Sequence, residues 1–156
     1  ETFAKVREHM PAKLLMVGDG PDRLAAENRC RELDVWEDVV FYGKTNEVSK
    51  ILFYSDLLLL PSQTESFGLA ALEAMAAATP VISTNTGGLP EVNIHGETGY
   101  LTAVGDVDAM AKHAVELLSD KEKLALFKDQ AYTYACRFDV HKIVPVYEEM
   151  YQKALA

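Results

Sequence analysis

The chain is poor in the residues that usually point to metal or redox chemistry. Its 156 residues include only two cysteines, Cys30 and Cys136, and their separation matches neither a zinc-binding nor a redox spacing. We therefore expect free thiols, as in a protein of the reducing cytoplasm. His95, His113 and His141 share no spacing with acids or cysteines, so the sequence predicts no metal site.

Positive charge is also scarce, because 15 Lys and Arg residues face 24 Asp and Glu residues, for a net charge of −9. This balance argues against nucleic acid or an anionic membrane as the main partner. No apolar run is long enough to span a membrane, and residues 1–10 read as the last turns of a helix rather than as a secretory signal. With 49% hydrophobic residues, the chain can bury the core of one domain.

Apolar runs typical of buried parallel strands alternate with helical patterns along most of the chain. The expected strands are residues 13–17, 39–42, 57–60, 81–84 and 100–102. The expected helices are residues 23–33, 47–54, 67–77 and 107–118, followed by 121–136 and 141–154. This alternation predicts an α/β fold, a Rossmann-like doubly wound parallel sheet with C-terminal helices.

Glu65 and Glu73, eight residues apart, bracket the most informative stretch of the chain. We expect Glu65 in the loop before a helix and Glu73 about two turns inside that helix, which places them roughly 9–12 Å apart along its axis. A helix mouth between two carboxylates suits a ligand with hydroxyl groups at each end and an anionic middle. Glu65 as a helix cap or a surface acid is the alternative interpretation, whereas the apolar neighbours of Glu73 suggest a packed carboxylate that needs partners.

Gly18 and Gly20 form a turn after the first expected strand, where open α/β sheets bind ligands. The turn fails as a dinucleotide fingerprint because Arg23 stands where a third glycine is needed. We expect it to line a ligand cleft, with a purely structural turn as the alternative. The turn at Gly87 and Gly88 is interpreted as structural.

Several motifs together resemble the donor-binding segment of retaining GT-B glycosyltransferases, within them glycosyltransferase family 4 (group 1). The motifs are residues 15–21 (LMVGDGP), 41–44 (FYGK), 65–76 (ESFGLAALEAMA), 80–82 (PVI), 87–92 (GGLPEV) and 96–101 (GETGYL). Residues 66–76 and 85–93 are most similar to those of enzymes that transfer N-acetylglucosamine to L-malate in bacillithiol biosynthesis. The resemblance covers almost the whole chain.

The resemblance implies a role for each candidate residue. Glu65 contacts the sugar hydroxyls and is the candidate catalytic residue, while Glu73 accepts hydrogen bonds from the ribose diol. The backbone around Ser66, Phe67, Gly68 and Leu69 lines the sugar and phosphates, with Gly68 leaving room for the ligand. Lys44 lies where the family meets the nucleobase, although a solvated lysine fits as well.

The resemblance further implies that residues 1–156 are an N-terminally truncated nucleotide-sugar domain. The central strand of the family's 3-2-1-4-5-6 sheet, with its basic residues, and the acceptor domain would lie outside this sequence. The space left by that strand predicts self-association or another strand filling the sheet.

The expected activity is retaining, metal-independent transfer of a hexose, N-acetylglucosamine first, from a UDP-sugar to an acceptor. L-malate is the first acceptor, and a polysaccharide or a lipid-linked sugar is the second. No cofactor is expected, and this chain alone is expected to be inactive. The alternatives are a GT-B nucleotide-sugar epimerase and a non-catalytic nucleotide-binding fragment.

Overall fold

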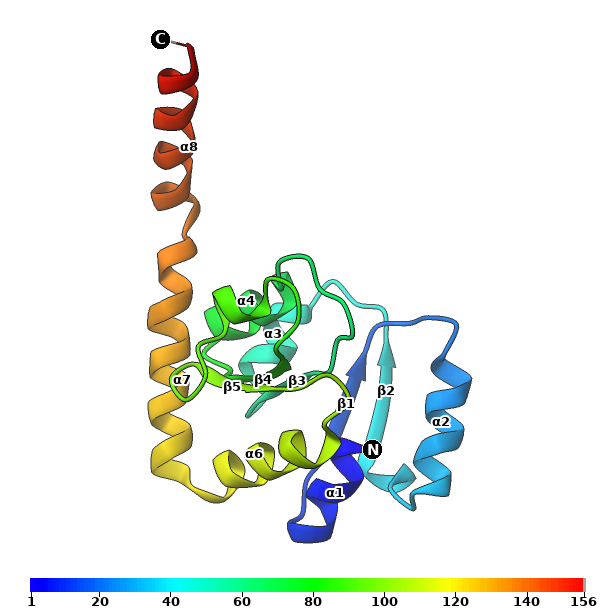
Figure 1. Cartoon of the computed structure of the whole chain (residues 1–156). Coiled ribbons are helices and arrows are strands. Elements are labelled where there is room, and N and C mark those ends of the chain that lie inside the picture. The colour runs from blue at the N-terminus through cyan, green and yellow to red at the C-terminus, as the bar shows by residue number, and fades with distance from the viewer. Residues whose placement is uncertain (156) are drawn as a thin grey trace.

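The computed structural model describes residues 1–155 and has an α/β architecture whose strands are all parallel (Figure 1). The strands are β1 (Leu14–Val17), β2 (Val39–Gly43), β3 (Leu58–Leu60), β4 (Val81–Thr84) and β5 (Gly99–Thr102). The first helices are α1 (Thr2–His9), α2 (Arg23–Glu32), α3 (Val48–Phe53), α4 (Leu69–Ala76) and α5 (Leu89–Val92). They are followed by α6 (Val107–Ser119), α7 (Lys121–Ala135) and α8 (Val140–Leu155), with short 3-10 turns η1 (Trp36–Asp38) and η2 (Cys136–Phe138).

The five strands form two separate sheets. In one, β1 pairs with β2, and in the other the order is β3-β4-β5. No strand within residues 1–155 joins β1 to β3. The predicted parallel α/β fold is confirmed, and the break falls where the family's central strand was expected to be missing.

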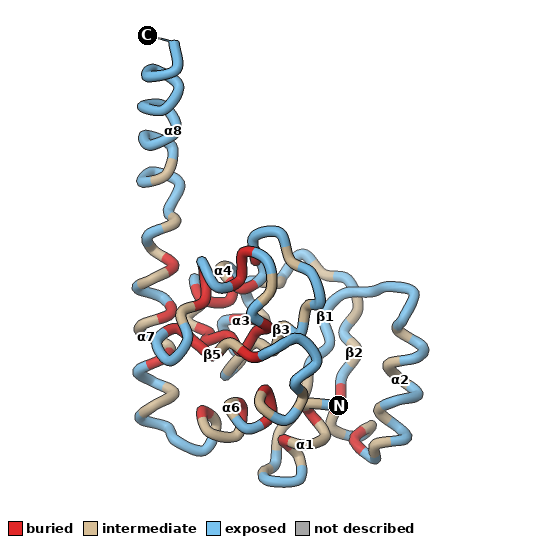
Figure 2. Tube along the Cα trace, viewed as in Figure 1, coloured by how far each residue is buried: buried red, intermediate tan, exposed pale blue. Residues whose placement is uncertain are grey.

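Each face of the three-stranded sheet is covered by one apolar cluster. Helices α4 and α7 cover one face around Met75 and Val81, while α6 and α7 cover the other around Ile82 and Leu117. These side chains are fully buried, and Figure 2 shows buried segments in α4, α6 and α7. The burial of every residue of β4 confirms that strand as the centre of its sheet.

A third cluster, around Phe3, Val35 and Val39, supports the two-stranded sheet. Helix α1 bridges the cores, because Phe3 lies in this cluster while Val6 lies in the cluster with Ile82.

The prediction that β1 is buried was wrong. Leu15, Met16 and Val17 are 38%, 40% and 41% exposed. The physical reason is that only one long edge of β1 is paired and that one face of the sheet, marked by the exposed Val40 and Tyr42, has no helix over it among the described residues. A parallel strand normally has both faces covered, so the exposure of β1 is unusual for a strand of this kind.

Helix α8 extends away from the body of the molecule (Figure 1). None of its residues is buried, although Val144, Tyr147, Met150 and Tyr151 recur at helical spacing. Such a periodic apolar face is typical of a helix that packs against another element. No helix in the described part of the chain is both long and apolar enough to cross a membrane.

Candidate functional site

The candidate residues lie on three loops that leave the carboxyl ends of β1, β2 and β3, and on helix α4, which carries Leu69 and Glu73. Gly18 and Gly20 follow β1, Lys44 follows β2, and residues 62–68 (the site loop) follow β3. Because β1 leads outward to β2 and β3 leads outward to β4, the chain direction reverses at the break between the sheets. Ligands of open α/β sheets bind at such reversal points, at the carboxyl ends of the strands.

Hydrogen bonds connect the start of the site loop to the end of β4 and to the segment that follows it. Thr84 Oγ1 donates a hydrogen bond to the carbonyl oxygen of Ser62 at 2.6 Å, and Thr86 Oγ1 donates to that of Gln63 at 3.2 Å. These bonds give the start of the loop a fixed path, although the loop is not part of a helix or a strand.

Gly87 and Gly88 press directly against the middle of the site loop. A Cβ atom at Gly88 would lie 2.7 Å from the carbonyl oxygen of Ser66 and 2.9 Å from the Cα of Phe67. At Gly87 it would collide with the carbonyl group of Glu65, and the backbone there has a φ of +55°. The structural interpretation of this turn holds. The two glycines let the connection between β4 and α5 pack directly against the backbone of the site loop.

Gly68 is the N-cap of α4, with a φ of +97° in the left-handed region. Its neighbours are inside the protein, since an added Cβ would meet Leu89 Cδ2 at 2.9 Å and Val92 Cγ2 at 3.1 Å. Apart from the expected role of leaving room for a ligand, packing on α5 and the left-handed backbone conformation require glycine at position 68.

Helix α5 is itself anchored by a buried amide. Asn93 Nδ2 donates to the carbonyl oxygen of Val81 at 3.1 Å and to Ser83 Oγ at 2.9 Å, while Asn93 Oδ1 accepts from Thr98 Oγ1 at 3.1 Å. Buried polar groups satisfied in this way rigidify their surroundings. Since α5 contacts Gly68 and follows Gly88, this network fixes the support on which the site loop rests.

Glu65 is half-buried in the site loop and does not cap α4. Its carboxylate accepts a hydrogen bond from the backbone N–H of Ser66 at 3.1 Å, whereas the N-cap of α4 receives no side-chain hydrogen bond. The alternative interpretation of Glu65 as a cap of α4 is therefore wrong.

Glu73 is the fifth residue of α4, a little more than one turn inside the helix rather than two. Its side chain is exposed, and no hydrogen bond or ion pair joins it to another described side chain, so the expectation of a packed carboxylate was wrong. Apolar residues next to Glu73 in the sequence do not imply that Glu73 is buried, because Ala74 and Met75 face the core while Glu73 and Ala76 lie on the opposite face of the helix. An exposed carboxylate remains able to accept hydrogen bonds from a diol.

The N-terminal turn of α4 between these two carboxylates has free backbone N–H groups and the positive end of the helix dipole. Cationic side chains nearby are few. Lys44 is exposed, and Arg23, at the start of α2, is paired with Glu27 at 2.9 Å and lies over the ring of Phe41. The arrangement suits an anion bound mainly by backbone amides.

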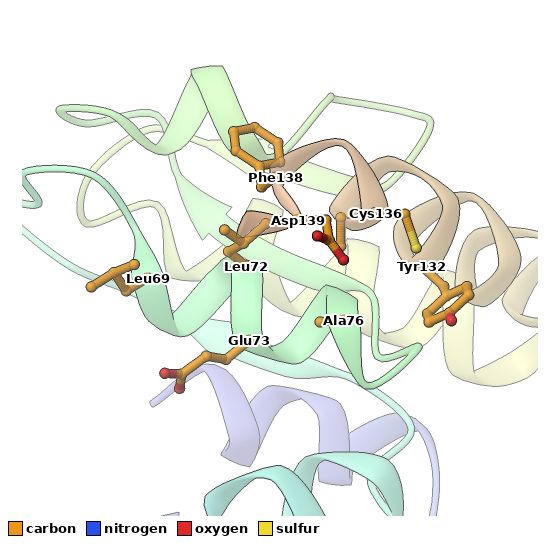
Figure 3. Close-up of a pocket in the computed structure, with 9 residues that line it drawn as sticks. Leu69, Leu72, Glu73, Ala76, Tyr132, Cys136, Phe138 and Asp139 are labelled. Atoms are coloured by element: carbon orange, nitrogen blue, oxygen red, sulfur yellow. The ribbon is translucent and has the colours of Figure 1, made fainter. Parts of the chain in front are cut away.

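A groove of about 280 Å³ lies between α4 and the end of α7. Leu72 and Glu73 line it from α4, and Cys136, Phe138 and Asp139 line it from the η2 segment (Figure 3). In Figure 3 the carboxylate of Glu73 extends away from Cys136 and Asp139. The structure thus brings the α4 end of the candidate site into contact with the C-terminal helices, which the sequence did not suggest.

Strong electrostatic coupling is found elsewhere, on β5, α6 and α7. Glu116 forms an ion pair with Lys123 and accepts a hydrogen bond from Tyr100 Oη at 2.9 Å. His113 Nδ1 lies 3.3 Å from the other carboxylate oxygen of Glu116. The hydrogen bond from Lys123 is the main cause that lowers the pKa of Glu116 from 4.5 to about 2. Burial raises the pKa of Tyr100. These groups hold helices to the sheet and do not line the candidate site.

Sequence reasoning missed Thr84 and Thr86 as supports of the site loop, and Phe138 as a residue that lines the groove beside α4. Only the Gly-Gly pair carried a signal, since consecutive glycines often mark close backbone approach. Among residues 1–155, no group of three or more His, Cys, Asp or Glu side chains is arranged to hold a metal ion.

Comparison with known proteins gives consistent matches across the chain. The family model for glycosyl transferases group 1 matches residues 1–134. N-acetyl-alpha-D-glucosaminyl L-malate synthase of Bacillus anthracis is 43% identical over 156 residues, covering 99% of this chain and 41% of that protein. 2-Deoxystreptamine N-acetyl-D-glucosaminyltransferase of Niallia circulans is 32% identical over 158 residues, covering 96% of this chain and 41% of that enzyme.

Solved structures agree with these matches. Anabaena Alr3699/HepE in complex with UDP superimposes with a TM-score of 0.90 at 25% identity, covering 97% of this chain and 44% of that one. Sucrose-phosphate synthase from Thermosynechococcus elongatus gives a TM-score of 0.86 at 27% identity, covering 99% of this chain and 41% of that one. This chain therefore spans less than half the length of the relatives it matches.

Proposed function

Since this chain belongs to the group 1 glycosyl transferases, we propose that it binds the nucleotide-sugar donor of a retaining hexosyl transfer. The observation that carries the proposal is the pair Glu65 and Glu73 around the free N-terminus of α4, at the carboxyl edge of the strands. A donor of the UDP-N-acetylglucosamine type offers the matching groups in series: a sugar, a diphosphate and a ribose.

We assign the individual roles from this geometry and from the family resemblance. Glu65 accepts hydrogen bonds from the sugar hydroxyls, and Glu73 accepts them from the ribose diol. Backbone N–H groups around Ser66, Gly68 and Leu69 bind the diphosphate, with the α4 dipole stabilising the charge that develops as it leaves. Phe67 contributes its backbone to the same wall.

Two further loops complete the donor cleft in this proposal. Gly18 and Gly20 leave an open approach after β1, since an added Cβ at either position has no neighbour within 4 Å. Lys44 lies beside this turn at the end of β2, because Gly18 N–H donates to the carbonyl oxygen of Gly43 at 2.9 Å. We place the nucleobase near Lys44.

The proposed donor is a UDP-sugar for two reasons. The solved structures most similar in fold include one that holds UDP, and the two curated relatives described above are named for N-acetylglucosaminyl transfer. L-malate is our first acceptor, because the relative at 43% identity is named N-acetyl-alpha-D-glucosaminyl L-malate synthase, and a polysaccharide or a lipid-linked sugar is the second. The proposed reaction uses the donor without a metal ion or a further cofactor.

The acceptor side of this reaction belongs, in our proposal, to a second domain of the full-length protein. The two sheets support this division of labour, because β1 and β3 lack the strand that would join them. We propose that a parallel strand from outside residues 1–155 occupies that position, and that its loop adds cations for the diphosphate.

Calorimetric titration of UDP into the 156-residue chain tests the assignment of Glu73. Glu73→Ala removes the acceptor of the ribose diol, and losing a charge-assisted hydrogen bond costs about 1.5–3 kcal/mol, or roughly ten- to a hundredfold in affinity. Glu73→Gln retains one acceptor oxygen and should lose less affinity. Because the Glu73 side chain is exposed, both variants should keep the thermal stability of the parent protein. Unchanged UDP affinity in Glu73→Ala would remove Glu73 from the site.

A further inference from the structure

The end of helix α7 reaches the site loop through aromatic contacts. The Phe138 ring, in η2, meets the Phe67 ring edge to face, with centroids 6.2 Å apart and planes at 73°. Phe138 also contacts Tyr134, with ring centroids 5.7 Å apart. The rings of Tyr134, Phe138 and Phe67 thus connect α7 to the end of the site loop that precedes α4.

The same helix end also holds α5. Tyr134 Oη donates a hydrogen bond to the carbonyl oxygen of Glu91 at 3.0 Å, and Arg137 lies over the Tyr134 ring at 4.9 Å. Because α5 packs against Gly68, the α7 end touches both the loop and the helix that supports it.

We propose that Phe138 is a positioning residue for the site loop, acting through Phe67. Phe67 is flanked by Ser66 and Gly68, whose backbone N–H groups bind the diphosphate in the proposed function on which this inference rests. Thr84 and Thr86 tie the loop at Ser62 and Gln63 only. Phe138 supplies a side-chain contact at Phe67, closer to the start of α4.

The test compares three variants of the 156-residue chain. Phe138→Ala removes the ring contact, and Phe138→Leu keeps apolar volume against Phe67. Phe127→Ala is the matched control, because Phe127 is a buried aromatic residue of α7 that packs against Tyr100 rather than the site loop. The two readouts are UDP affinity by calorimetry and hydrogen exchange of the backbone amides of residues 62–72 without ligand.

We expect Phe138→Ala to weaken UDP binding about three- to tenfold, the range of one aromatic pair, and to speed exchange in residues 62–72. Phe138→Leu keeps apolar contact with Phe67 but loses the ring pair, so its UDP affinity should lie between those of the parent protein and of Phe138→Ala. Phe127→Ala should lower the melting temperature. When each protein is measured at the same interval below its own melting temperature, Phe127→Ala should leave the UDP affinity and the exchange of residues 62–72 unchanged. That pattern separates positioning from a general loss of stability.

The exchange measurement keeps this inference separate from the proposed function. If the parent protein fails to bind UDP, the proposed function is wrong, yet faster loop exchange in Phe138→Ala alone still supports positioning by Phe138. If Phe138→Ala leaves loop exchange unchanged, or if Phe127→Ala changes it equally, the positioning role is wrong whatever the protein binds.

Discussion

Replacing Gly87 by alanine should damage the proposed donor site through a single added methyl group. The new Cβ would collide with the carbonyl oxygen of Glu65 and would lie 2.7 Å from its carbonyl carbon, whereas ordinary Cβ contacts begin at 3.4 Å, so this carbonyl group must move by more than 0.7 Å. Losing the charge-assisted hydrogen bonds that Glu65 is assigned to make with the sugar would cost about 1.5–3 kcal/mol. We therefore expect the affinity for a nucleotide sugar to fall about tenfold or more.

A second cost of this substitution has nothing to do with the site. Gly87 has a φ of +55°, and a left-handed backbone costs a residue with a side chain about 1–2 kcal/mol. The melting temperature of Gly87→Ala should therefore fall even without the collision, and a control must carry the same penalty.

Gly96→Ala is that control. Gly96 has a φ of +81°, yet an added Cβ there has no neighbour within 4 Å, and its turn precedes β5 at the amino end of the sheet. Titration of UDP-N-acetylglucosamine into both variants isolates the effect of the collision. The reasoning is refuted if Gly87→Ala binds as the parent protein does, or if Gly96→Ala loses as much affinity.

Three other predictions address the sugar, the charge network and the sheet edge. Glu65→Ala should weaken binding of the nucleotide sugar more than binding of UDP, which lacks the sugar; equal losses by calorimetry would remove Glu65 from the sugar site. Glu116→Gln should melt below the parent protein at neutral pH, because the folded-state pKa of Glu116 is lowered from 4.5 to about 2. That stabilisation is complete above pH 4.5 and is lost as the pH falls towards 2, so the two melting curves should converge there; a constant difference would contradict it. The 156-residue chain should self-associate through the unpaired edge of β1 in light scattering, and Val17→Lys should reduce this association, while a monomer at every concentration would argue against a borrowed strand.

The regular elements could be predicted from the sequence because their signals are local. The strand expected at residues 81–84 matches β4, and the helix expected at 107–118 matches α6 to within one residue. Asp106 accepts a hydrogen bond from Ala109 N–H as the N-cap of α6. Alternation of apolar strands and amphipathic helices also fixed the parallel α/β class.

Burial and mutual support could not be predicted in the same way. The exposure of β1 depends on an unpaired edge, and that of Glu73 depends on which face of α4 meets the core. The close approach of Gly87 to Glu65 joins residues 22 positions apart through a turn whose path is set by α5. Such contacts are tertiary, and hydrophobic periodicity contains no information about them.

The division into two sheets has a consequence for how this domain melts. The β1–β2 sheet and the β3–β4–β5 sheet share no strand ladder, and helix α1 links their separate cores through Phe3 and Val6. A ligand that touches the loops after both β1 and β3 would bind only when both halves are folded, and it would stabilise that state by RT ln(1 + [L]/Kd). The donor would then act as a thermodynamic cross-link, merging two partly independent transitions into one cooperative event whose calorimetric and van't Hoff enthalpies agree.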